Sequence, residues 1–149
     1  MEPITLTNLH TKSLQEVFDY VAAHMLTQNA RSLLPDGSGR AYRGQDGRMC
    51  AVGCLMSGDE YEVIDSVFRR GCVPGTAEGE SVEGSRWVAV CRAMVHAGIT
   101  CPSEDMQMLL TGLQRVHDRY NTRDWPQILS STAAAHGLTF SPEKYRNAQ

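Results

Sequence analysis

Helical periodicity is the feature that most limits how this 149-residue chain can fold. Apolar side chains recur every three or four residues in five segments, which places them on one face of an α-helix. The expected helices cover residues 14–29, 57–71, 87–97, 100–121 and 124–136. A chain of this length normally forms one domain. We therefore expect a mainly α fold with about five helices around one core, in a single domain over residues 1–149.

Capping signals support the helix boundaries. Ser13 and Glu16 fit a capping box, in which each side chain bonds to the backbone N–H of the other residue. Ser57 or Asp59 is suited to start the second helix, and Pro102 is expected in the first turn of the fourth. These residues indicate where the helices begin, independently of the apolar pattern.

The segment from residue 40 to residue 61, RAYRGQDGRMCAVGCLMSGDEY, is the densest in special residues, with three arginines, four glycines and two cysteines. Two short runs flank Gly44-Gln45-Asp46-Gly47, and a loop of this kind is typical of a β-hairpin. Asp46-Gly47 would supply the positive φ angles of the turn. We expect a small β-hairpin within residues 40–52, inserted in the helical domain and making the fold α+β.

Charge and hydropathy limit the partners and the cellular location expected for the protein. The net charge is −3, so the protein has no overall positive field that would attract nucleic acid. Nucleic acid is therefore only weakly supported as a partner. No apolar run approaches the ~20 residues that a membrane span needs. Residues 1–12 lack the apolar segment of a signal peptide. We expect a cytoplasmic protein with no membrane contact, whose five cysteines are reduced.

Two cysteines are the candidates for metal or thiol chemistry. Cys50 and Cys54 form a C-x₃-C pattern, whereas structural zinc sites usually present two close pairs. Cys54 follows Gly53 at an expected strand-to-helix junction, where a thiolate can be stabilised. Cysteine also packs often as a small apolar residue. We favour packing and expect no cofactor, with a metal- or thiol-dependent enzyme using Cys50 and Cys54 as an alternative.

Other catalytic signatures are missing from the sequence. No phosphate-binding or hydrolase motif occurs. The carboxylates of Glu78, Glu80 and Glu83 fall in a Gly-rich stretch, residues 72–84, that is expected to be a surface loop. We therefore assign no catalytic residue and regard an enzyme as the minority interpretation.

The arginines of the expected hairpin are the candidates for binding. Arg43 and Arg48 would lie near its tip together with Tyr42 and Asp46, and a forked guanidinium suits phosphate or carboxylate. The candidate binding residues are thus Tyr42, Arg43, Asp46 and Arg48. In the structural alternative, an arginine pairs with Asp46 or Asp59 and holds the hairpin against the next helix. The sequence leaves both interpretations open.

The pattern YRGQDGRMCAVGCLMSGDEY, with SLQEVFDYVAAHMLTQ before it and LQRVHDRYNTRDWPQIL after it, resembles small uncharacterised proteins of tailed bacteriophages and prophages. The resemblance covers most of the chain and is weakest over residues 72–84. It implies an accessory protein in the cytoplasm of a bacterial host, which binds a host or phage macromolecule as an inhibitor or modulator. A host protein is the implied partner.

Self-association is a third hypothesis. Trp87 and Trp125 are the two tryptophans of the chain, and both lie in expected helices. If they left an apolar patch exposed, the protein would form a homo-oligomer.

Overall fold

The computed structural model describes residues 2–143. The helices in this range are α1 (Leu14–Gln28), α2 (Gly58–Arg69), α3 (Trp87–His96), α4 (Glu104–Arg119) and α5 (Trp125–Ala135). Short 3₁₀ segments lie at Leu9–Thr11, Gln45–Gly47, Gly53–Leu55 and Thr122–Asp124. The expected mainly helical architecture is confirmed, and the helix bounds agree with the apolar pattern to within a few residues.

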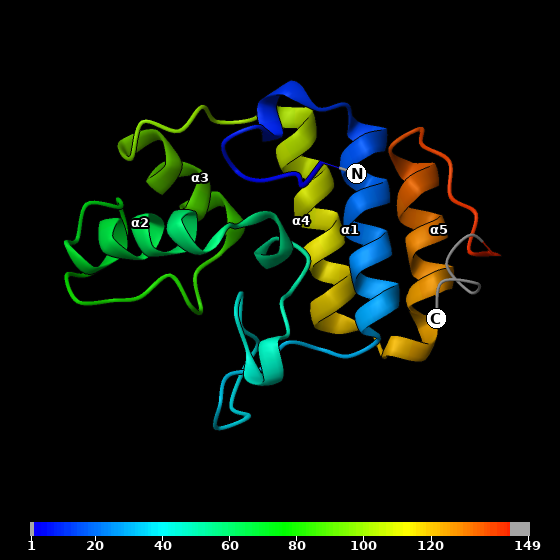
Figure 1. The fold of residues 1–149 in the computed structure, drawn as a ribbon, viewed down its shortest axis with the longest axis horizontal. Coiled ribbons are helices and arrows are strands. Elements are labelled where there is room, and N and C mark those ends of the chain that lie inside the picture. The colour runs from blue at the N-terminus through cyan, green and yellow to red at the C-terminus, as the bar shows by residue number, and fades with distance from the viewer. Residues whose placement is uncertain (1, 144–149) are drawn as a thin grey trace.

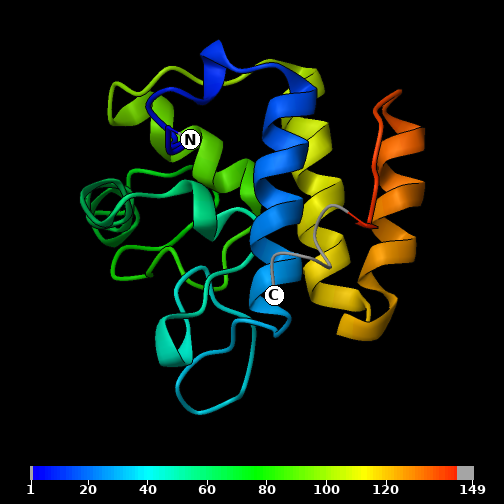
Figure 2. The ribbon, with the colours of Figure 1, turned by 45° about the vertical axis from the view of Figure 1, so that its right-hand side comes forward.

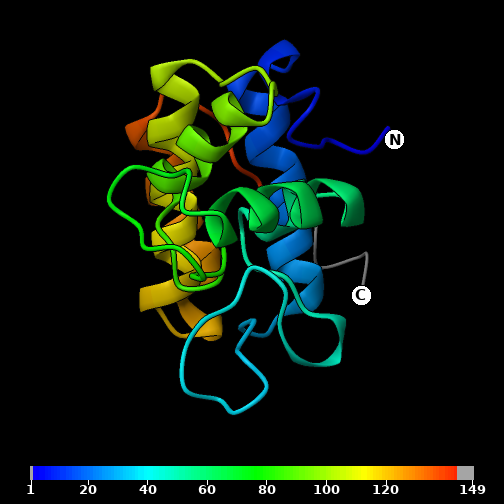
Figure 3. The same ribbon diagram turned by 90° about the vertical axis from the view of Figure 1, so that its left-hand side faces the viewer.

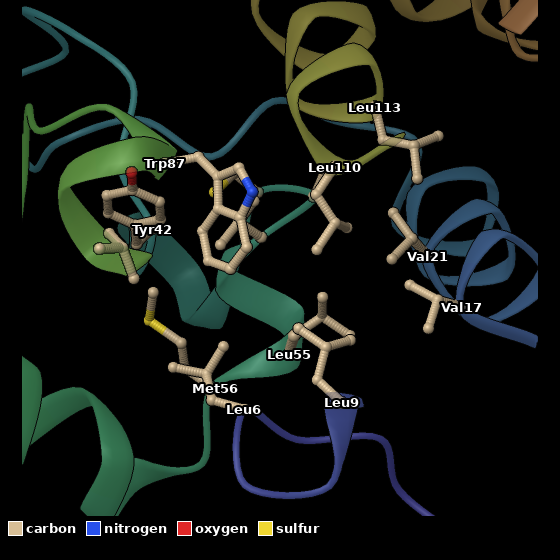
Figure 4. Packing of buried hydrophobic residues seen from close by; sticks show 14 of the residues in the cluster. Leu6, Leu9, Val17, Val21, Tyr42, Leu55, Met56, Trp87, Leu110 and Leu113 are labelled. Carbon is tan, nitrogen blue, oxygen red and sulfur yellow. The ribbon is translucent and has the colours of Figure 1, made fainter. Parts of the chain in front are cut away.

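Helices α1, α4 and α5 form one layer, in which each contacts the other two. α1 and α4 run in the same direction and α5 runs back in the opposite direction (Figure 1). Leu113 of α4 and Val21 of α1 point toward one another in the close view of the core, and both are fully buried (Figure 4). Interlocking apolar faces of this kind account for the stability of the layer.

Helices α2 and α3 lie on the other side of this layer, with α3 against α4 and α2 against α3 (Figure 1). α5 lies on the far side of the layer from α2 and α3 (Figure 2). α2 contacts α3 and runs across the direction of α1 (Figures 1 and 3). α3 in turn contacts α4, so the buried cluster is continuous from α2 to α5.

Three helices begin at a serine whose side chain accepts a hydrogen bond from the backbone. Ser13 and Glu16 form the expected capping box at α1. Of the two candidates for the start of α2, Ser57 and not Asp59 is the N-cap, and it forms a capping box with Glu60. α4 begins at Glu104 with Ser103 as its N-cap, so the neighbouring proline precedes the helix instead of lying in its first turn. α3 differs because its N-cap residue, Arg86, makes no such bond.

We call residues 29–57, which join α1 to α2, the connecting segment. The prediction of a β-hairpin within this segment is wrong. The turn is present, since Asp46 and Gly47 have positive φ angles of 57° and 73°. Its arms, however, do not extend into strands. In the described part of the chain, antiparallel pairing is limited to two isolated bridges, which join Leu33 to Arg40 and Arg43 to Met49.

The ladder of backbone hydrogen bonds expected for the hairpin does not form, because side chains from other elements bond to the N–H and C=O groups of its arms. The amides of Tyr42 and Arg43 donate to the carboxylate of Glu83, from the segment before α3. The amide of Met49 donates to the side chain of Gln28 in α1, whose own amide group donates back to the Met49 carbonyl. These groups are satisfied without a partner strand, so no further pairing is needed.

Two glycines allow the connecting segment to fold back closely on itself. A Cβ atom on Gly44 would lie 2.5 Å from the carbonyl oxygen of Leu33. One on Gly53 would overlap the carbonyl oxygen of Tyr42. No side chain fits at either position, which explains why glycine stands there.

Both tryptophans are buried, with 4% of Trp87 and none of Trp125 exposed. The apolar patch that would have favoured self-association is therefore not formed by these residues.

Candidate functional site

Tyr42 is part of the buried packing rather than an exposed stacking ring. Only 5% of the residue is exposed, and its hydroxyl donates to the carbonyl of Ser85 at 2.6 Å. Burial raises the pKa of the Tyr42 hydroxyl, so the group stays protonated and keeps donating. Tyr42 thus ties the connecting segment to the start of α3.

Arg43 is also held within the protein. Its guanidinium donates to the carbonyl oxygen of Met56 at 2.5 Å and lies 5.3 Å from the ring centre of Tyr61. Within residues 2–143, Arg43 does not form the ion pair with Asp46 or Asp59 that was considered as the structural alternative, and a carbonyl and a ring are its partners instead.

The other two predicted binding residues lie at the surface. Asp46 is exposed at the tip of the turn, and Arg48 is partly exposed. Within residues 2–143, neither side chain forms a hydrogen bond or ion pair with another residue. The four predicted residues therefore do not converge on one site, and a role for them in binding stays a prediction.

Glu83 organises this corner of the molecule, although the sequence suggested a solvated loop residue. Its carboxylate accepts from the Tyr42 amide at 2.7 Å, the Arg43 amide at 3.1 Å and the Tyr61 hydroxyl at 2.8 Å. Burial, followed by the bond to Glu83, raises the pKa of the Tyr61 hydroxyl. No local pattern distinguishes this glutamate from Glu78 or Glu80, because its partners are distant in sequence.

The two candidate cysteines are poorly suited to thiolate chemistry. Burial raises the pKa of the Cys50 thiol to about 12 and also raises that of Cys54. The Cys50 sulfur accepts from the Gly53 amide at 3.3 Å, and Cys54 donates to the Ala51 carbonyl at 3.1 Å. A nucleophilic cysteine needs the opposite shift of its pKa. Among residues 2–143, no three histidine, cysteine or acidic residues are placed to share a metal ion.

A buried histidine has partners that resemble a catalytic triad in composition alone. His117 Nδ1 lies 2.8 Å from Asp118, and its Nε2 accepts the backbone amide of Ser32 at 3.0 Å. The Ser32 hydroxyl donates elsewhere, to the carbonyl of Arg48. His117 is fully buried, so this arrangement fastens α4 to the connecting segment rather than activating a nucleophile.

An open cleft of about 610 Å³ lies between α4, the start of α3 and the connecting segment. α4 contributes one polar stripe, formed by residues 111, 114, 115, 118 and 119 at helical spacing. The lining contains four guanidinium groups and one carboxylate, that of Asp118. The arginines, which we call the cleft arginines, are Arg40, Arg86, Arg115 and Arg119.

Side chains of the protein already use the main acceptors of the cleft. Asp118 accepts from His117 and from the side-chain amide of Gln114 at 2.9 Å, and Arg40 lies 3.8 Å away. The oxygen of the Gln114 side chain accepts from the Val52 amide. The positive charge of the cleft is therefore only partly balanced from within.

The chain matches no protein-family model, no curated protein and no solved structure. None of the helices in residues 2–143 has the length and apolar character required to cross a membrane.

Proposed function

We propose that the protein acts by binding a macromolecule and that the cleft is its contact surface. The observation that carries the proposal is the gathering of four arginines around one carboxylate, on a chain whose net charge is −3. Guanidinium groups form forked contacts with carboxylates and phosphates, and arginine is enriched where proteins meet. A concentrated positive surface on an acidic protein selects for an anionic partner.

Binding is favoured over catalysis because no reactive group near the cleft is activated. Cys50 lines the cleft, but burial raises the pKa of its thiol to about 12. His117 lies behind Asp118 and is fully buried. A thiol- or metal-dependent enzyme remains the alternative, and self-association is a further one without an observation that favours it.

The resemblance of the sequence to phage and prophage proteins supplies the context of this proposal. It favours an accessory protein that inhibits or modulates a host process in the bacterial cytoplasm, with a host protein as its partner. Asp46 and Arg48, exposed on the neighbouring turn, would extend the contact surface. Tyr42 and Arg43 would support it from within, since Tyr42 lines the cleft and both residues are anchored by Glu83.

Partner capture from a bacterial lysate tests the proposal. The wild-type protein is compared with Arg115→Glu/Arg119→Glu and with a control, Arg70→Glu/Arg123→Glu, which changes the net charge equally at exposed positions outside the cleft. Arg48→Ala tests the contribution of the turn. We expect one saturable partner to be retained by the control and lost by the cleft variant. Equal capture by both double variants would contradict the role of the cleft.

A further inference from the structure

The unused polar groups of the cleft are mainly hydrogen-bond donors. Arg86, Arg115 and Arg119 are exposed, and in the described range their side chains form no hydrogen bond or ion pair with another residue. In the same part of the chain, the Arg40 side chain has only the contact of 3.8 Å with Asp118. The complementary ligand is therefore rich in acceptor oxygens and carries negative charge.

The start of α3 adds backbone donors at the same place. Its N-cap residue, Arg86, provides no side-chain acceptor, and the amides of Trp87 and Val88 have no acceptor within residues 2–143. All three residues line the cleft. The amino end of a ten-residue helix carries a partial positive charge and unpaired N–H groups, both of which favour an oxyanion.

The indole of Trp87 lies between the cleft and the apolar core. Its Nε1–H is buried and has no hydrogen-bond partner among residues 2–143, although the residue is 4% exposed and lines the cleft. Figure 4 shows this nitrogen on the side of the ring that faces Leu110 of α4. Because Leu110 is fully buried and does not line the cleft, this donor faces the apolar core, and the cleft arginines and the amino end of α3 are the donors that a ligand would meet.

We infer that the cleft recognises a chain of linked phosphate groups, such as a nucleoside di- or triphosphate carries. This inference rests on the proposed function in taking the cleft as the binding surface, and it goes beyond that function by assigning the cleft a small phosphate ligand in addition to the macromolecular partner. A carboxylate brings a single charge, whereas each phosphate brings up to about two charges and several acceptor oxygens without a strong donor. Several linked phosphates therefore match four guanidinium groups and a helix amino end better than one carboxylate does.

The size and lining of the cleft favour a small phosphate ligand over a nucleic acid strand. Its volume of about 610 Å³ is in the usual range for small-molecule sites, about 300–1,000 Å³. Binding of single strands depends on exposed aromatic rings that stack with bases. The two aromatic residues of the lining, Tyr42 and Trp87, are instead buried at 5% and 4% exposure.

Calorimetric titration with inorganic tripolyphosphate tests the inference directly. We expect saturable binding to the wild-type protein, weakened about tenfold or more in Arg115→Ala/Arg119→Ala and unchanged in Arg70→Ala/Arg123→Ala. Arg115→Lys/Arg119→Lys keeps the charges but removes the forks, so its affinity should fall between the two. Circular dichroism and urea unfolding verify that each variant is folded. No binding by the wild type, or equal affinity in the Arg115 and Arg119 alanine variant, would overturn the inference.

Further ligands separate the possible sources of the phosphates. Equal affinity for ATP and tripolyphosphate supports recognition of the phosphate chain alone, and tighter binding of ATP supports an added contact with the nucleoside. Short poly-glutamate and a single-stranded oligonucleotide are the competing classes. Cleft-dependent binding of poly-glutamate without tripolyphosphate would overturn the phosphate inference and leave the proposed function intact. Much tighter cleft-dependent binding of the oligonucleotide would overturn the choice of a small ligand.

Discussion

The helical layer of α1, α4 and α5 and the connecting segment are stabilised in different ways. In the layer, buried apolar faces meet, and the backbone is satisfied within each helix. In the connecting segment, the backbone turns repeatedly and bonds to side chains from other elements, including Glu83 and Gln28. Burial of apolar area is non-directional, whereas a carboxylate that accepts two amides requires one geometry. The layer should therefore tolerate similar replacements better than the segment does.

Truncation of an apolar side chain should have the largest effect on the layer. Leu110 in α4 is fully buried, so Leu110→Ala leaves a cavity. We expect a loss of about 2–5 kcal/mol in the free energy of unfolding, measured by urea denaturation. Met108→Ala on the same helix is the control, because Met108 is 65% exposed and should change stability by about 0.5 kcal/mol or less. A similar loss in both variants would mean that burial does not govern the layer.

Adding a single methyl group to the connecting segment should lower the free energy of unfolding almost as much as Leu110→Ala does. The new Cβ of Gly53→Ala would overlap the Tyr42 carbonyl, and relieving this contact requires the backbone to move. We expect a loss of about 3 kcal/mol. Gly58→Ala, at the start of α2, meets no atom within 4 Å and should be neutral or slightly stabilising. If urea unfolding gave both variants wild-type stability, the close approach at Gly53 would have no energetic role.

Loss of one carboxylate should loosen the segment further. Glu83→Gln removes the charge that accepts from the Tyr42 and Arg43 amides and from the Tyr61 hydroxyl. We expect a cost of about 2 kcal/mol, since hydrogen bonds to charged groups are worth more than neutral ones. Glu80→Gln, at an exposed position in the same loop, is the matched control. Amide hydrogen exchange should show faster exchange at Tyr42 and Arg43 in Glu83→Gln only, and unchanged exchange there would argue against the clamp.

A smaller, pH-dependent effect is expected at Glu60. Burial alone would raise the pKa of its carboxyl, but hydrogen bonds from Ser57, Thr7 and Leu6 outweigh burial and lower it. A lowered pKa in the folded state contributes stability that is present above the unfolded pKa and is lost as the pH falls through the folded one. Wild-type stability should thus fall more steeply on acidification than that of Glu60→Gln.

The cost of Glu60→Gln near neutral pH should be about 1 kcal/mol, because glutamine preserves part of the capping box. Glu62→Gln, at an exposed position of α2, should follow the wild-type pH dependence. Parallel pH profiles of stability for the wild type and Glu60→Gln would contradict a lowered pKa of the Glu60 carboxyl.

The same contrast explains what the sequence could predict. Periodicity and capping signals are local, so the five helices and the capping serines Ser13 and Ser57 were foreseeable. The hairpin prediction failed because its local signals were correct only for the turn at Asp46 and Gly47. Glu83 and Gln28, which replace the ladder, are about 41 and 21 residues from the amides they bind, and no local pattern reports such contacts.

The candidate site was harder to predict than the fold. The sequence drew attention to arginines that are neighbours in the chain, but the guanidinium of Arg43 contacts Met56 and Tyr61, whereas Arg48 lies at the surface. Folding gathers Arg40, Arg86 and Arg115 instead, from three segments that are far apart in the sequence. Arg115 and Arg119 are four residues apart, and this spacing could have shown from the sequence that they share one face of a helix.

Glu83 also has a consequence for the cleft. Its carboxylate holds the backbone of Tyr42, two residues after Arg40, and it directly precedes Gly84 and Ser85, which also line the cleft. The position of one lining segment relative to the other is thus fixed by contacts within the protein before any ligand arrives. A preorganised cleft loses little conformational entropy on binding, so its arginines can contribute more of their interaction energy to affinity.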